Sequence, residues 1–139
     1  MCLKKLHLLN FRSFKDFLLP LENTALIYGD NGAGKTSILE GIHFALKSKS
    51  FRTTSINSMI NKDADFFRIS SDIKDCKRAL EKKTGKALIK ENYDSFDKYD
   101  FLPLLINNFS LRFLEQNKDV RRDFIDYYLF HVKHEYLEK

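Results

Sequence analysis

A phosphate-binding pattern lies between Gly29 and Thr36, where the sequence Gly-Asp-Asn-Gly-Ala-Gly-Lys-Thr fits G-x-x-x-x-G-K-[ST]. Such a loop wraps a polyphosphate in backbone N–H groups, so glycine is needed where a side chain would block the approach or where φ is positive. Lys35 can then reach the β- and γ-phosphates, and the hydroxyl of Thr36 can coordinate Mg²⁺. The pattern predicts a site for ATP and Mg²⁺ with Thr36 as the metal ligand. Its candidate contacts are Gly29, Asp30, Asn31, Gly32, Ala33, Gly34, Lys35, Thr36 and Ser37.

The segments on either side of this loop have the order that a phosphate-binding loop requires. Residues 25–28 are a short apolar, β-prone run, which predicts a strand entering the loop. After the loop, apolar side chains recur at helical spacing, and we expect that helix to direct its N-terminus at the phosphates. These side chains are Ile38, Leu39, Ile42, Ala45 and Leu46. A glycine-rich turn that only joined a strand to a helix would have no need for Lys35 and Thr36.

The charge, the cysteines and the hydropathy of the sequence indicate which partners and which compartment to expect. Lysine and arginine outnumber aspartate and glutamate by 24 to 19, mostly in the first third of the 139 residues. This suits a polyanionic partner such as ATP or DNA, although a net charge of +5 is equally consistent with ordinary solubility. Cys2 and Cys76 are too isolated for a disulfide framework or a metal cluster, which favours a reducing cytoplasm. No apolar run could span a bilayer, so we expect a cytoplasmic protein without a membrane partner.

Alternating apolar residues predict strands on both sides of the phosphate loop. The first two of these strands should pair as a hairpin. Residues 76–83 are ambiguous, because residue propensity alone favours a helix there. Near the end of the chain we expect an amphipathic helix with Asp119 as its N-cap. The predicted strands are residues 3–10, 17–19, 66–73 and 101–106.

Three motifs resemble a known family of ATPase heads. Residues 10–14 (Asn-Phe-Arg-Ser-Phe) resemble the N-F-[RK]-S/N-[FY] stretch at the start of SMC-type, RecF-type and OLD-type heads. The resemblance narrows to the RecF family at residues 50–53 (Ser-Phe-Arg-Thr) and at residues 120–132, which look like that family's R-R-x-F-[LI]-D-x-x-L-F-H segment. In those families the basic residue of the first motif lies near the nucleotide, so the resemblance implies that Arg12 contacts ATP. The alternative for Arg12 is a solvated arginine in a turn.

The resemblance also implies a fold. It is an α/β P-loop NTPase, the N-terminal lobe of an ABC/SMC-like head, with an antiparallel β segment and a C-terminal amphipathic helix, incomplete relative to the family. Residues 1–139 are then a single ATP-binding lobe, in which residues 1–54 hold the hairpin, the P-loop strand and its helix. Residues 55–108 are mostly β. The resemblance therefore favours a strand rather than a helix over residues 76–83, followed by a turn at residues 84–86 and a strand at residues 87–89. Residues 109–139 begin the helical arm.

Two parts of a complete P-loop ATPase are missing from the sequence. No strand ends in the aspartate that holds Mg²⁺ (Walker B), and no L-S-x-G-type signature is present. Residues 104–106 run into Asn107 and Asn108, where the RecF family typically has Pro-Glu or Pro-Asp. In that family these parts lie beyond the point where this chain stops, so we expect weak Mg-ATP binding and negligible hydrolysis by the isolated chain.

The leading interpretation is therefore the ATP-binding portion of a RecF-like protein of DNA replication and recombinational repair. In that family, two heads are thought to clamp ATP, close on duplex DNA and cooperate with RecO and RecR proteins. DNA binding rests on the family and on mild basicity, since no DNA-binding motif is visible. One alternative is a small P-loop kinase that uses Arg112, Arg121 and Arg122 as a lid. Another is a non-catalytic remnant or a fragment of an OLD-type ATPase.

Overall fold

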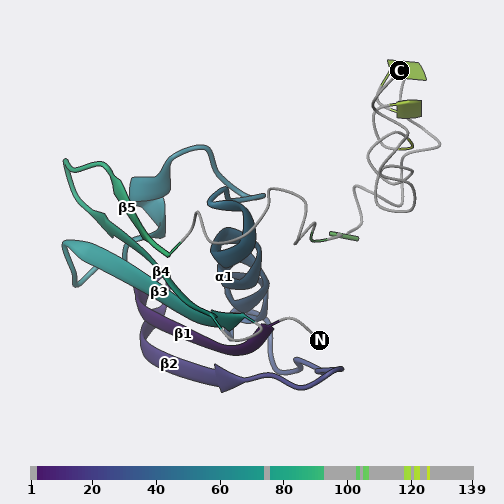
Figure 1. The fold of residues 1–139 in the computed structure, drawn as a ribbon, viewed down its shortest axis with the longest axis horizontal. Coiled ribbons are helices and arrows are strands. Elements are labelled where there is room, and N and C mark those ends of the chain that lie inside the picture. Colours follow the sequence, from purple (N-terminus) through teal and green to yellow (C-terminus); the bar gives the residue numbers. More distant parts are fainter. Residues whose placement is uncertain are drawn as a thin grey trace. The chain divides into compact units, whose positions relative to one another are not determined.

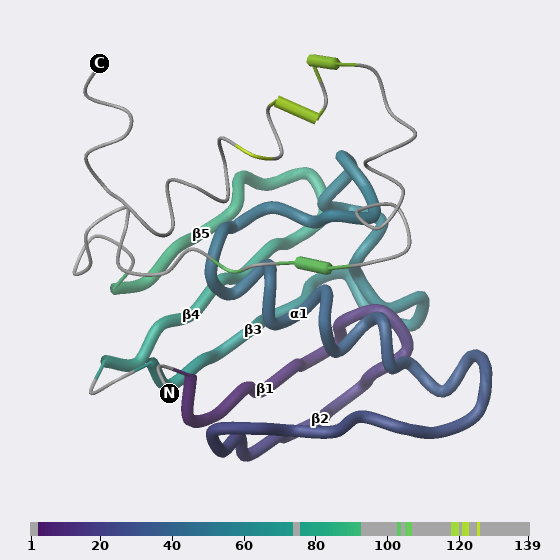
Figure 2. Tube along the Cα trace, turned by 90° about the vertical axis from the view of Figure 1, so that its right-hand side faces the viewer, coloured from purple at the N-terminus to yellow at the C-terminus, as the bar shows by residue number. Residues whose placement is uncertain are grey.

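The computed structural model describes residues 3–73, 76–92, 103, 105–106, 118–119, 121–122 and 125. The chain divides into two compact units, residues 1–101 and residues 102–139. The described part of the first unit is a five-stranded antiparallel sheet in the order β2-β1-β3-β4-β5, with helix α1 lying across one face (Figure 1, Figure 2). Its elements are β1 (Leu3–Phe11), β2 (Phe14–Pro20), α1 (Lys35–Lys47), the 3₁₀ turn η1 (Ile56–Met59), β3 (Phe66–Ile73), β4 (Cys76–Lys83) and β5 (Leu88–Glu91).

The predicted N-terminal hairpin is confirmed and has a longer second strand than expected. β1 pairs with β2 from Lys5 opposite Pro20 to Phe11 opposite Phe14, and on its other side β1 pairs with β3. A bulge between Leu3 and Lys5 shifts the register against β3 and returns Leu3 to the buried face. β1 therefore presents one continuous apolar row to the core. That row is Leu3, Leu6, Leu8 and Phe11.

Strand β4 settles the ambiguity over residues 76–83. It pairs with β3 along its whole length, from Ile73 opposite Cys76 to Phe66 opposite Lys83. A helix over this segment, which propensity favoured, is wrong, because pairing with β3 buries Ala79 and Leu80 and outweighs weak local preference. β5 then adds to β4 after a turn at Gly85, whose φ of +71° suits glycine.

Helix α1 packs closely against β1 at Gly41. A Cβ added to Gly41 would lie 2.8 Å from Cδ2 of Leu8, so glycine is what allows the helix to approach the sheet. One turn further on, Phe44 meets Phe67 edge to face with ring centroids 5.7 Å apart, and Phe67 meets Phe11 in the same way at 5.4 Å. These contacts fix the start of α1 relative to the β1–β2 turn, and the functional residues described below lie at that junction.

The strand predicted over residues 25–28 is absent. These residues are irregular, and Leu26 and Tyr28 are each 85% exposed. A strand is stabilised by hydrogen bonds to a neighbouring strand, and no described strand pairs with this segment. The apolar run is therefore β-prone in sequence but has no sheet to join within the described ranges.

The second unit is described at a few positions only. Residues 118–119, 121–122 and 125 are helical. Because Lys118 is already helical, Asp119 lies inside the helix, and its prediction as the N-cap is wrong. Pro103 and residues 105–106 are not in a strand, so the strand predicted over residues 101–106 is wrong there, and a proline cannot donate to a ladder. The rest of the predicted amphipathic helix, and Arg112, lie outside the described residues. No helix in the described ranges is long and apolar enough to cross a membrane.

Candidate functional site

The loop before α1 has the backbone that its sequence requires. Gly29, Gly32 and Gly34 have φ values of +147°, +87° and +94°, in a region that side chains disfavour. Gly34 is restricted a second time, because a Cβ there would lie 2.6 Å from Cζ of Phe14 in β2. The thirteen-residue helix α1 begins directly after it, at Lys35. The ring of Phe14 in the β1–β2 hairpin therefore lies so close to the loop that only glycine fits at position 34.

Lys35 bends back over this loop. Its Nζ donates to the carbonyl oxygens of Gly29 and Asp30, each at 2.7 Å. The ammonium is thus held at the concave side of the loop, where backbone N–H groups and the N-terminal end of α1 add positive potential. A cation held in this position matches the phosphate-binding role predicted for Lys35.

A cavity of about 340 Å³ opens at this end of α1. Gly29, Asp30 and Ala33 are not among its lining residues, and the first two serve instead to hold Lys35. Thr36, which is predicted to bind a metal, is exposed, and Ser37 is buried. No group of three His, Cys, Asp or Glu side chains among the described residues could hold a metal ion. The lining residues are Ser13, Asn31, Gly32, Gly34, Lys35, Thr36, Ser37 and Arg52.

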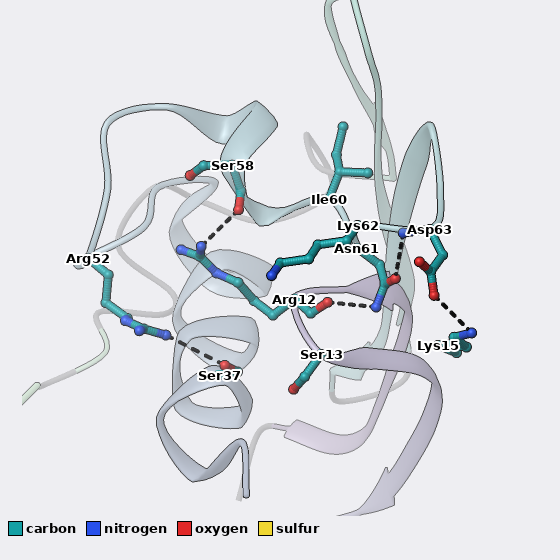
Figure 3. A pocket seen from close by; sticks show the side chains of 10 residues that line it. All are labelled: Arg12, Ser13, Lys15, Ser37, Arg52, Ser58, Ile60, Asn61, Lys62 and Asp63. Carbon is teal, nitrogen blue, oxygen red and sulfur yellow. Dashed lines mark hydrogen bonds and ion pairs between the residues drawn. The ribbon is translucent and has the colours of Figure 1, made fainter. Parts of the chain in front are cut away.

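A second cavity, of about 520 Å³, adjoins the first and shares Ser13, Ser37 and Arg52 with it (Figure 3). It lies between the β1–β2 turn, the start of α1 and the segment from residue 52 to residue 63. Its charged side chains are mostly basic, and Lys15 is paired with Asp63 at 3.0 Å. The remaining lining residues are Arg12, Lys15, Ser58, Ile60, Asn61, Lys62 and Asp63.

Arg12 lies in this second cavity and not in the first. Its guanidinium forms a two-pronged pair with Glu40 of α1, from Nε at 2.9 Å and from Nη2 at 2.7 Å, and Nη1 donates to the carbonyl of Ser58 at 2.8 Å. Its backbone is also held, because the N–H of Arg12 donates to Met59 and its carbonyl accepts from Asn61, each at 2.7 Å. Arg12 is therefore held on Glu40 and Ser58, and it does not line the cavity of the phosphate loop.

Glu40 is a fully buried carboxylate on the α1 face that covers the sheet. Burial alone would raise its pKa, but hydrogen bonds from Arg12 and Ser50 and the charges of Arg12 and Arg52 outweigh burial and hold the pKa of Glu40 below its usual value. The Ser50 hydroxyl donates to it at 2.5 Å, and Nη1 of Arg52 lies 3.3 Å away. Glu40 is therefore ionised at neutral pH and joins three segments distant in sequence.

Sequence reasoning did not select Glu40 or Arg52 as site residues. Arg52 appeared there only as part of a family motif, and Glu40 was not considered. One signal could have found Glu40, since it is the single acidic residue of the segment 35–47 and falls on the same helical face as Ser37 and Phe44. A carboxylate at a buried helical position requires a cationic partner, and Arg12 and Arg52 are the partners.

Comparison with known proteins shows which family has this fold and this phosphate loop. A family model described as an AAA domain matches residues 5–137. The chain belongs to the AAA domain family, a class of P-loop ATPases. Within that class it is similar to DNA replication and repair protein RecF, at 35% identity to that of Teredinibacter turnerae and 33% to that of Chromohalobacter salexigens. These matches cover 96% and 99% of this chain but 38% and 41% of the relatives, so the chain spans about two-fifths of their length.

A solved structure agrees with this placement. The recombination mediator protein RecF with ATP in the RecFOR pathway superposes with a TM-score of 0.73 at 22% identity, over 96% of this chain and 39% of that one. The resemblance to the N-terminal portion of the RecF family, which the motifs predicted, is confirmed. The fold class is confirmed with it, as a P-loop ATPase domain in which an antiparallel sheet packs with the helix that follows the phosphate loop, and the chain covers 39% of that structure.

Proposed function

We propose that this chain binds Mg-ATP through residues 29–37, as the nucleotide-binding portion of a RecF-like protein of DNA replication and repair. The observation that carries the proposal is the cavity at the start of α1, which is framed by positive-φ glycines and faces the Lys35 ammonium. A triphosphate in that cavity meets backbone N–H groups, a helix N-terminus and Lys35 together. Thr36, exposed at the cavity, supplies the hydroxyl for Mg²⁺.

We propose further that the isolated chain does not turn ATP over at a useful rate. Hydrolysis requires a group that orients the attacking water, and in P-loop enzymes an acidic residue also helps to hold the metal. Among the described residues none that lines the cavity is acidic. Within the described ranges, the cavity offers groups that bind a phosphate chain but no carboxylate that could activate water.

DNA binding and partner proteins complete the proposal for the whole protein. The net charge of +5 and the relatives named DNA replication and repair protein RecF support DNA as a partner. The neighbouring structure belongs to the RecFOR pathway, so RecO- and RecR-like proteins or a second head are the proposed protein partners. Action in the cytoplasm, in response to DNA damage, follows from the same kinship.

Isothermal titration calorimetry with Mg-ATP tests the central claim. The Lys35→Ala variant should lose at least roughly tenfold in affinity, because it removes the cation that meets the phosphates. Lys86→Ala is the matched control, since Lys86 is an exposed lysine in the β4–β5 turn. Equal affinity in the Lys35→Ala variant and the wild-type chain would contradict the proposed site. Phosphate release above the Lys35→Ala background would contradict the proposed lack of hydrolysis.

Salt dependence tests the proposal for DNA. If the chain binds duplex DNA through phosphate contacts, the affinity should fall steeply between low and moderate salt as counterions are released. A titration of the chain against a short duplex at several salt concentrations gives the slope. An affinity that does not respond to salt would rule out a phosphate-dominated mode.

A further inference from the structure

One buried carboxylate holds two arginines beside the proposed nucleotide site. Glu40 has no exposed side-chain surface, while the side chains of Arg12 and Arg52 are 20% and 42% exposed. The cluster of one negative and two positive charges leaves a net positive charge next to the cavity that Lys35 faces. Only one arginine is needed to neutralise Glu40, so the second is available for another anion.

The two arginines are held in different ways. Arg12 uses its two-pronged face on Glu40 and its remaining Nη on the carbonyl of Ser58, at distances from 2.7 to 2.9 Å. Arg52 reaches Glu40 from a single nitrogen, Nη1, at 3.3 Å, and the same nitrogen lies 3.5 Å from the hydroxyl oxygen of Ser37. Both distances exceed the usual 2.7–3.2 Å for N–H···O bonds. Each guanidinium nitrogen of Arg12 therefore makes a short hydrogen bond, whereas Arg52 is weakly held through one nitrogen.

The two arginines also differ in their distance from the phosphate loop, and the weakly held Arg52 is the nearer one. Arg52 lines both the cavity of the phosphate loop and the adjoining one, whereas Arg12 lines only the second. In Figure 3, Arg52 extends from its loop toward Ser37 on α1, and Arg12 turns away toward Ser58. Ser37 directly follows the predicted metal ligand Thr36. The weakly held guanidinium is thus the one next to the proposed phosphates.

We infer that Arg52 is the phosphate-binding arginine of this site and that Glu40 is its positioning residue. The inference rests on the proposed function. When a triphosphate occupies the cavity, the Arg52 guanidinium keeps Nη1 beside Glu40 and offers its other nitrogens to phosphate oxygens, and no covalent bond changes. Arg12 stays on Glu40, so the buried carboxylate keeps a counter-charge throughout. The role that the resemblance gave to Arg12 therefore passes to Arg52.

Calorimetry with inorganic tripolyphosphate and with Mg-ATP separates the two arginines. Arg52→Ala should weaken both ligands roughly tenfold with little change in melting temperature, and Arg52→Lys should recover part of the loss by restoring the charge. Arg12→Lys should lower the melting temperature while leaving tripolyphosphate affinity within about twofold, because it breaks the fork on Glu40. Wild-type affinity for tripolyphosphate in Arg52→Ala, or an equal loss in Arg12→Lys, would overturn the assignment.

A double-mutant cycle tests the part played by Glu40. If Glu40 acts by placing Arg52, the Arg52→Ala substitution should cost roughly tenfold in the wild-type background and under about threefold in a Glu40→Gln background. An undiminished tenfold loss in that background would show that Glu40 does not position Arg52. The Lys35→Ala variant tests the proposed nucleotide site independently of Arg52. If Lys35→Ala binds normally the nucleotide site itself is wrong, whereas a loss in Lys35→Ala without one in Arg52→Ala overturns only the present inference.

Discussion

The guanidinium of Arg12 and the carboxylate of Glu40 form a two-pronged pair across 28 residues of sequence, at 2.7 and 2.9 Å. The pair joins the β1–β2 turn to the first turns of α1, so it fixes the hairpin against the helix that carries the phosphate loop. Because Glu40 is fully buried, this is a buried salt bridge, and removing one partner of such a pair strongly lowers the free energy of unfolding.

Glu40→Ala should lower the free energy of unfolding by about 3 kcal/mol, because it leaves the part-buried Arg12 without its counter-charge. Urea denaturation measures the change. Glu91→Ala is a matched control, since Glu91 also pairs with an arginine, Arg68 at 2.6 Å, but is half exposed. The control should lose less than about 1 kcal/mol. An equal loss of unfolding free energy in the two variants would show that the buried pair contributes no more to stability than the exposed pair.

The stability of the chain should fall in acid through the titration of Glu40. Its pKa is lowered on folding, so the stabilisation is fully present above the unfolded-state value of about 4.3 and is lost as the pH falls through the folded pKa. Urea midpoints measured between neutral pH and about pH 3 should decline, and the decline should be shallower in Glu40→Gln. Parallel profiles for the two proteins would mean that other carboxyl groups carry the acid sensitivity.

Gly41→Ala should destabilise the chain although alanine favours helices. The gain in helix propensity is about 0.5–1 kcal/mol, whereas the new Cβ would lie 2.8 Å from Cδ2 of the fully buried Leu8. Overpacking of this kind costs about 1–3 kcal/mol, so we expect a net loss. In a Leu8→Ala background the clash is removed, and Gly41→Ala should there be neutral or stabilising. A loss that persists in that background would mean that Leu8 is not the cause.

Gly34→Ala should reduce Mg-ATP affinity more than tenfold, because the site combines a φ of +94° with a Cβ position 2.6 Å from Phe14. Gly85→Ala is the control. Gly85 also has a positive φ, +71°, but nothing lies within 4 Å of the added Cβ. It should cost about 1–2 kcal/mol of stability and leave nucleotide affinity unchanged. Calorimetry and urea denaturation on both variants separate the loop effect from the general cost of a strained backbone.

Local features were predictable from the sequence, and features that need a partner were not. The phosphate loop, the hairpin and α1 depend on glycine positions and short-range periodicity, and all three are present. Residues 25–28 have the composition of a strand but lack a neighbour to pair with among the described residues. β4 shows the opposite case, since a helix-prone segment is a strand because β3 lies beside it.

The arginine cluster was hidden for a similar reason. The contacts of Glu40 with Arg12 and Arg52 span 28 and 12 residues, and no spacing rule connects such positions. The sequence marked Arg12 through a family motif, but only the structure shows that each of its guanidinium nitrogens already donates to Glu40 or Ser58. The hydrogen-bond distances to Glu40, which are short for Arg12 and long for Arg52, distinguish the two arginines, and the sequence does not contain them.

The exposed segment before the phosphate loop offers a way to observe the site. Tyr28 is 85% exposed, directly precedes Gly29, and belongs to a chain that has no tryptophan. A Tyr28→Trp variant would therefore carry a single indole at the edge of the loop, and its emission would report on that place alone. The absence of a strand at residues 25–28, which removes a packing partner, thus makes this position suited to an optical probe of ligand entry.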